Sequence, residues 1–159
     1  MGKYRDDREY ADDFIPEIKR IVGPHLLSEA DYVVDTQQAS DLVVLNVSNM
    51  SIACRVRRPG YLDNFPWDFT IRSKRDSGAD TELGKILDGW ADWMFYGHAC
   101  GDGSKRFQRW FLIDLDIFRY DLIFNERQIK SQAKSNEDGT YFVAYDVRSF
   151  EPEMMIASG

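Results

Sequence analysis

The segment DFTIRSK, residues 68–74, alternates apolar and polar side chains along its whole length. Side chains on a β-strand point alternately to opposite faces, so Phe69 and Ile71 share one face. The other face carries Asp68, Thr70, Arg72 and Lys74. Such a pattern is typical of a strand with one covered face and one polar face. The segment therefore predicts a half-buried strand and requires that the chain build a β-sheet.

Positive charge recurs on alternate residues in two stretches of the chain. The residues are Arg55, Arg57 and the adjoining Arg58 in the first stretch, and Arg72, Lys74 and the adjoining Arg75 in the second. If the two strands are neighbours, their polar faces form a plate of four cations, and phosphate is the commonest partner of such a surface. The alternative is that these residues protect sheet edges against aggregation, a usual role of basic side chains on edge strands.

The remaining segments predict helices and strands in alternation. A helix is expected over 10–27, interrupted or started at Pro16, because proline disrupts a helix interior. The other expected elements are a short strand at 30–36, a hairpin of 41–47 with 51–58, a helix from Thr81 to about Tyr96, a strand at 109–115, a helix at 116–130 and a last strand at 140–147. This order predicts a mixed α/β fold with a central mixed sheet flanked by helices.

Composition limits the classes of protein to consider. The 159 residues match one domain, and no stretch approaches the roughly 18 apolar residues of a membrane span. Two cysteines and two histidines are too few for a disulfide framework or a zinc cluster, which favours a cytoplasmic protein and a loop or packing role for His98. The net charge of −7 argues against indiscriminate coating of nucleic acid, so any such contact should be local. Of the aromatic residues at 90–96, Trp93 is expected to face outward.

Carboxylates near the cationic strands suggest metal-dependent chemistry. Cleavage of a phosphodiester assisted by a divalent metal needs carboxylates to hold the ion and a cation to stabilise the phosphate charge. Asp41 opens the expected hairpin, and Asp68 shares a strand face with Arg72 and Lys74. Both aspartates are equally explained as residues of strand ends or turns.

The order of elements resembles the restriction-endonuclease-like fold of the PD-(D/E)XK nuclease superfamily. The resemblance is carried by SDLVVL, IACRVRRPGY, DFTIRSK and TELGKILDGWADWMFYG, and the last of these is similar to stretches in phage-encoded members. It implies one domain, with a nuclease-like core at 8–115, a helix and strand extension at 116–150 and a tail at 151–159. For an enzyme, it also implies a Mg²⁺-dependent endonuclease acting on nucleic acid, with DNA and RNA both left open.

The chain departs from the pattern of that superfamily where the catalytic motif should lie. Arg55 stands in place of the acid and Arg57 in place of the lysine, and a guanidinium neither ligates a cation nor serves as a general base. Some members resemble a variant in which the carboxylate moves to the following helix. Glu82 would then hold the metal together with Asp41, with Lys85 beside it, although Glu82 and Lys85 also fit an exposed ion pair.

Three functions therefore compete. The first is a metal-dependent nuclease, in which Asp41 together with Glu82 or Asp68 holds Mg²⁺ while the basic residues stabilise the phosphate. The second is a noncatalytic module on the same fold that binds a phosphate or an acidic protein surface. The third is a protein that inhibits a host nucleic-acid enzyme by presenting its acidic surface. The sequence does not predict an oligomeric state.

Overall fold

The computed structural model describes residues 2–29, 42–44, 50–75 and 81–159. The chain forms two compact units, residues 1–50 and 51–159, and each is considered by itself below. Asp41 and the strand expected at 30–36 lie outside the described residues.

The described part of the first unit is mostly helical. Its elements are α1 (Gly2–Asp12), α2 (Ile15–Val22), the 3₁₀ turn η1 (Gly23–Leu26), β1 (Leu27–Glu29) and β2 (Leu42–Val44). Pro16 lies in the first turn of α2, where the amide hydrogen that it lacks would have no helical partner. The prediction that the helix is interrupted or restarted near this proline is confirmed. β1 pairs with β2 in antiparallel orientation.

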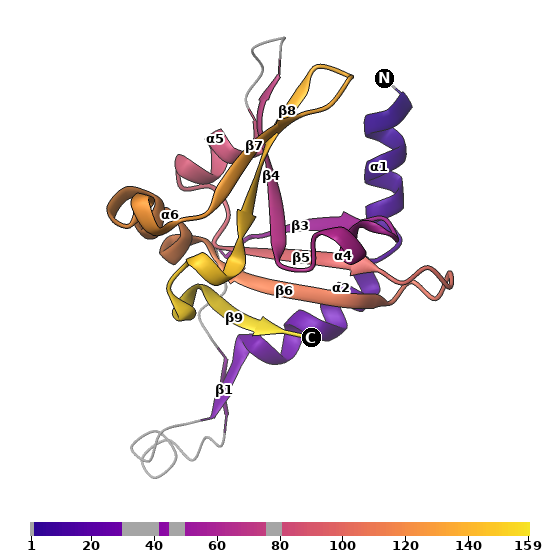
Figure 1. Cartoon of the computed structure of the whole chain (residues 1–159). Helices are drawn as coiled ribbons and strands as arrows, with labels where there is room; N and C mark the ends of the chain where they lie inside the picture. The colour runs from indigo at the N-terminus through magenta and orange to yellow at the C-terminus, as the bar shows by residue number, and fades with distance from the viewer. Residues whose placement is uncertain (1, 30–41, 45–49, 76–80) are drawn as a thin grey trace. The chain divides into compact units, whose positions relative to one another are not determined.

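The second unit contains two sheets and short helices (Figure 1). A four-stranded mixed sheet has the order β3 (Ile52–Arg57), β5 (Trp93–Ala99), β6 (Phe107–Asp114) and β9 (Met155–Ser158). A three-stranded antiparallel sheet has the order β4 (Asp68–Arg75), β8 (Thr140–Asp146) and β7 (Ser131–Ser135). The helices are α4 (Tyr61–Asn64), α5 (Glu82–Leu87) and α6 (Leu115–Phe124), with 3₁₀ turns η2 (Glu126–Gln128), η3 (Val147–Ser149) and η4 (Pro152–Met154). The predicted mixed α/β class is confirmed.

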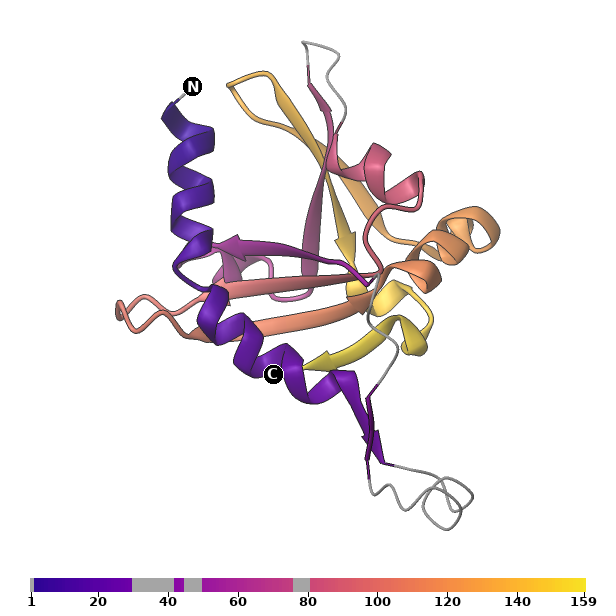
Figure 2. The ribbon, with the colours of Figure 1, turned by 180° about the vertical axis from the view of Figure 1, so that it is seen from behind.

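The core of the second unit lies where the two sheets face each other. Figures 1 and 2 show the strands of the three-stranded sheet running crosswise to those of the four-stranded sheet. Phe69 on β4 is fully buried and packs against rings from both sheets and from α6. Its ring centroid lies 5.5 Å from that of Tyr145, 5.8 Å from that of Phe118 and 6.4 Å from that of Tyr96. These aromatic contacts join the two sheets into one core.

Strand β4 matches the expected segment, and its apolar face is buried as predicted. The predicted half-buried character is only partly right. Thr70, on the supposedly polar face, is 7 % exposed, and its hydroxyl lies 3.2 Å from the hydroxyl of Tyr96 on β5. The middle of β4 is therefore covered on both sides, and its polar face becomes exposed only toward Lys74.

The hairpin predicted from 41–47 and 51–58 is wrong. β2 pairs with β1, whereas β3 pairs in parallel with β5, with Ile52 opposite Trp93 and Arg57 opposite His98. The parallel pairing requires a long crossover, and α4, β4 and α5 supply it. β5 is buried along its whole length and has seven residues against three in β2, so it offers β3 the longer partner. β3 and β4 belong to different sheets, so the assumption that they are neighbouring strands is also wrong.

The helix predicted from Thr81 to Tyr96 ends at Leu87. Thr81 caps its first turn as expected, because its hydroxyl accepts from the Gly84 amide. Gly89 then takes a positive φ of 90°, which ends the helix, and β5 follows. Trp93 is buried in that strand, so its predicted outward position is wrong, whereas Trp90 in the turn is 70 % exposed.

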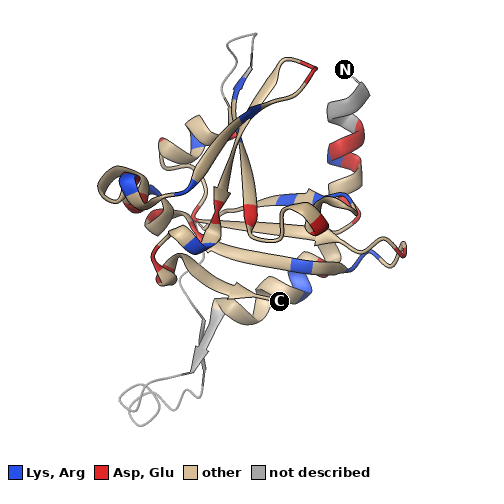
Figure 3. Ribbon diagram, in the orientation of Figure 1, with Lys and Arg blue, Asp and Glu red and all other residues tan. Residues whose placement is uncertain are grey.

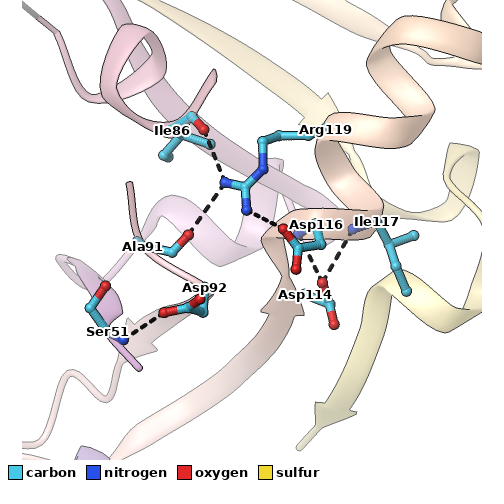
Figure 4. A network of polar contacts seen from close by, with 8 residues as sticks. All are labelled: Ser51, Ile86, Ala91, Asp92, Asp114, Asp116, Ile117 and Arg119. Atoms are coloured by element: carbon cyan, nitrogen blue, oxygen red, sulfur yellow. Dashed lines mark hydrogen bonds and ion pairs between the residues drawn. The ribbon is translucent and has the colours of Figure 1, made fainter. Parts of the chain in front are cut away.

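A polar network fixes this helix-to-strand turn against α6 (Figure 4). Nη1 of Arg119 donates to the carbonyls of Ile86, at 2.9 Å, and Ala91, at 3.3 Å, while Nη2 pairs with Asp116. Oδ1 of Asp114 accepts from the first amides of α6 and caps that helix. The Arg119 bonds thus tie the carbonyl of Ile86, near the end of α5, and that of Ala91, in the following turn, to α6.

The C-terminal elements differ from the expected tail. Residues 152–158 form η4 and β9, and β9 pairs with β6 through Phe111 opposite Ser158. β7 was not predicted either; it forms a hairpin with β8 across the turn at Gly139, where φ is 74°. Both additions are edge strands, whose short sequences carry little periodicity.

Candidate functional site

The predicted metal ligand Glu82 is engaged by basic and amide groups of the protein. Its Oε2 accepts from Nη1 of Arg55 at 3.1 Å and from the backbone amide of Arg72 at 3.2 Å. Lys85 lies exposed on the same short helix. A carboxylate oxygen that already accepts two hydrogen bonds is a poor fit to Mg²⁺, which needs the same lone pairs. The contacts of Glu82 thus support a structural ion pair with Arg55 rather than a metal site.

Asp68 lies directly opposite Asp146 in the β4–β8 pair. Burial, and then the charge of Asp146, raise the pKa of the Asp68 carboxyl. Arg148 donates to both oxygens of Asp146, at 2.9 and 2.7 Å, and lowers the pKa of that carboxyl. Over the described residues, no three or more His, Cys, Asp or Glu side chains gather as a metal site would require. The role of Mg²⁺ therefore stays a prediction.

The predicted basic residues are spread over different surroundings. Arg55 is held by Glu82, and the guanidinium of Arg57 lies 4.0 Å from the centre of the Tyr61 ring. Nζ of Lys74 lies 5.7 Å from the centre of the Tyr141 ring, on the other sheet. Arg58 is exposed and Arg72 is partly buried. The four cations therefore do not form one plate on paired strands. Arg57 instead belongs to a site that the alternation of basic residues did not predict.

That site is an exposed group of aromatic rings, each contacted by a cation. Tyr61, Phe65 and Trp67, on and just after α4, are 43, 39 and 36 % exposed. The nearest cations to their ring centres are Arg57 on Tyr61 at 4.0 Å, Lys134 on Phe65 at 4.3 Å, and Arg109 and Arg148 on Trp67 at 3.9 and 5.0 Å. We call these seven residues the aromatic–cation surface. Figure 3 shows basic and acidic residues interspersed over the strands of both sheets.

A cavity of about 100 Å³ opens at this surface. Arg57, Tyr61, Phe65 and Lys134 of the aromatic–cation surface contribute to its wall. Its other lining residues come from the sheets and are Asp68, Thr70, Tyr96, His98, Phe142 and Ala144. The cavity thus lies between the two sheets, within residues 51–159.

His98 is the buried polar residue of this cavity. It is 2 % exposed, and neither ring nitrogen has a hydrogen-bond partner within the described parts of the chain. The register places it between Arg57 on β3 and Arg109 on β6. Burial, and then the charges of Arg57 and Arg109, lower the pKa of His98 to about 4. The imidazole is therefore neutral at neutral pH, with one donor and one acceptor nitrogen.

The sequence reasoning missed Tyr61, Phe65 and Trp67, and it assigned His98 to loop or packing. A signal was present for the aromatic residues, because YLDNFPW places three large rings within seven residues that Pro66 keeps too short for a regular helix or strand with a core face. Aromatic side chains outside a periodic element have no core face to occupy, which favours an exposed role. No comparable signal marks His98, because its site forms only when β3, β4 and β8 come together.

Comparisons with protein-family models, with curated proteins and with solved structures gave no match to this chain. None of the described helices is both long and apolar enough to cross a bilayer. The arguments for function therefore rest on the geometry of the site.

Proposed function

We propose that this protein binds single-stranded nucleic acid on the aromatic–cation surface, as a noncatalytic binding module. One observation carries the proposal. Three exposed rings on and just after α4 each have a cation close to the ring centre, and these cations come from neighbouring strands. Proteins that hold single strands combine aromatic platforms, on which bases stack, with basic groups that follow the phosphates.

The guanidinium groups extend the stacking platforms. Bases stack on the plane of an arginine as well as on an aromatic ring. Arg57 lies over Tyr61 and Arg109 over Trp67, so each pair presents flat surface and positive charge together. Unpaired bases offer the complementary faces, whereas bases inside a duplex are already stacked.

The charge of the surface favours contact with only a few phosphates. Arg148 is neutralised by its two hydrogen bonds to Asp146, which leaves Arg57, Arg109 and Lys134 as the main cations. Asp68 offsets part of their charge. About two phosphates should then be neutralised, which gives a slope of roughly −1.4 for log K against log salt on a single strand. Such local binding is compatible with an overall net charge of −7.

Metal-dependent cleavage and enzyme inhibition stay predictions of the sequence. No described group of carboxylates supports the first, and nothing in the described surfaces favours the second. A cytoplasmic, reducing location belongs to the same proposal and is supported by Cys54 and Cys100, which are both free thiols.

The experiment is a titration of labelled oligonucleotides followed by fluorescence anisotropy. Single strands of about 12 nucleotides span a typical site of one domain. We expect saturable binding at about 50 mM salt and weaker binding to duplex of the same length. Trp67→Ala should weaken binding by about 5-fold to 150-fold, the range for loss of one stacked base.

Trp90→Ala is the matched control, because it removes an exposed tryptophan in the turn after α5, outside the aromatic–cation surface. It should leave the affinity unchanged. Equal losses for the two variants, or no binding at concentrations up to about 100 µM, would refute the proposal. The same samples with Mg²⁺ or EDTA, analysed by gel, test for cleavage; turnover that needs the metal would favour the nuclease prediction instead.

A further inference from the structure

The size of the cavity limits what it can hold. One water occupies about 30 Å³ of liquid, and an apolar cavity of about 150 Å³ accepts benzene. A volume of about 100 Å³ that opens outward at Tyr61 and Phe65 therefore suits one small planar ring inserted edge first. A fused double ring would exceed it.

The wall of the cavity is largely apolar, but His98 contributes two buried ring nitrogens that have no hydrogen-bond partner among the described residues. A buried polar group without a hydrogen bond destabilises the folded state, so the two nitrogens of His98 need an explanation. The hydroxyls of Thr70 and Tyr96 bond each other at 3.2 Å, and that bond uses one of their two hydrogens. One hydroxyl hydrogen and the His98 nitrogens thus stay able to bond a ligand that enters.

The opening of the cavity is built for the rest of a nucleotide. Tyr61 and Phe65 give it apolar ring walls, while Arg57 and Lys134 place cations beside them. The matching ligand has a small ring with donors and acceptors within the cavity and a negative charge at the opening. A pyrimidine nucleotide has this structure.

We propose that the cavity takes one unpaired pyrimidine base of the bound strand and that His98 forms a hydrogen bond with the polar edge of this base. This inference rests on the function proposed above. The neighbouring phosphate lies against Arg57 and Lys134. Burial of the base supplies a hydrogen-bond partner to His98, and the restricted volume excludes purines. The protein therefore prefers pyrimidine strands.

Nuclear magnetic resonance of the imidazole groups tests this on the unmodified protein. The chain has two histidines, and His25, in the other compact unit, is an internal control. Titration with oligo(dT) should shift the ring signals of His98 and leave those of His25 in place. Oligo(dA) should bind to the surface with little change at His98. Shifts of equal size with both oligonucleotides, or none at His98 with either, would overturn the inference.

Two variants test the preference in the anisotropy assay. Wild type should bind oligo(dT) about 5-fold to 150-fold more tightly than oligo(dA), the range for one well-read base. His98→Phe keeps a planar ring but removes the nitrogens, and Ala144→Ile fills the cavity from its β8 wall. Each should reduce the preference to within about 2-fold while the affinity for oligo(dA) is kept.

The outcomes separate the two proposals. If no oligonucleotide binds, the proposed function fails; if strands bind without preference, or the variants weaken both strands equally, only the base cavity fails. Thymidine monophosphate serves as a further arm. Binding of this nucleotide as tightly as oligo(dT) would show that the ligand is a free nucleotide and would overturn the assignment to a strand.

Discussion

His98 combines deep burial with two cationic neighbours, and both favour its uncharged form. Its pKa is about 4 in the folded protein, against an ordinary value of 6.5. Between these values the unfolded chain binds a proton that the folded chain does not. The free energy of unfolding should therefore fall as the pH decreases from about 6.5 toward 4.

We expect this effect to amount to about 1–3 kcal/mol, since one pKa unit corresponds to about 1.4 kcal/mol. Urea unfolding at pH of about 7.5 and about 4.5 measures it, with His98→Gln compared to wild type. The variant should lose less stability than wild type over this interval. His25→Gln, which keeps His98, should behave as wild type. Equal losses in wild type and His98→Gln would show that the titration of His98 does not differ between the folded and unfolded chains.

A residue of the site could be predicted only where its role follows from its neighbours in the sequence. Arg57 was selected because it follows Arg55 on a strand, and the structure places it in the aromatic–cation surface. Glu82 was selected as a metal ligand, yet its partner is Arg55, which is 27 positions away. Sequence spacing gives no account of which distant charge a carboxylate meets.

At the scale of elements, α5 and the turn that follows it offer a matched pair of glycines. Gly84 lies inside α5, and a Cβ there would meet only the Thr81 hydroxyl at 3.6 Å, an ordinary contact. Gly84→Ala should therefore raise the free energy of unfolding by about 0.5–1 kcal/mol, because alanine favours the helix. Gly89 has a φ of 90°, so Gly89→Ala should lower it by about 1–2 kcal/mol through backbone strain alone.

Chemical denaturation at neutral pH decides both signs. The space around a Cβ at Gly89 is open, so a loss there cannot come from a steric clash. A neutral or stabilising Gly89→Ala would mean that the turn can change its backbone conformation, and the structural reason given for the end of α5 would then be wrong.

Strand β4 could be predicted and strand β5 could not, for the same physical reason. The polar face of β4 becomes exposed toward Lys74, so apolar and polar residues alternate along the strand. β5 is buried on both faces, and its continuous apolar residues extend the helical spacing of α5 without a break in pattern. Only Gly89 marked the boundary.

At the scale of the whole molecule, the two compact units differ in charge. Residues 1–50 contain five basic and ten acidic side chains, so residues 51–159 carry a net charge of only −2. Every member of the core cluster found in the described part of the chain lies after residue 51. We therefore predict that a fragment of residues 51–159 folds cooperatively and binds oligo(dT) more tightly than the full chain at low salt, because an acidic unit is removed.

Circular dichroism during thermal unfolding tests the folding of this fragment, and anisotropy at two salt concentrations tests its affinity. The advantage of the fragment should shrink as salt increases, since screening weakens interactions between distant charges. An unfolded fragment would show that residues 1–50 complete the core. An advantage independent of salt would show that their effect is not electrostatic.

The order of the strands along the chain alternates between the two sheets. β3, β5, β6 and β9 belong to one sheet, and β4, β7 and β8 to the other. Along the chain, β4 lies between β3 and its partner β5, and β9 follows β8. Neither sheet can form from a continuous stretch, so relative contact order is high and folding is expected to take milliseconds to seconds rather than microseconds. A nascent chain would have to wait for β8 before the three-stranded sheet closes, and for β9 before the four-stranded sheet does.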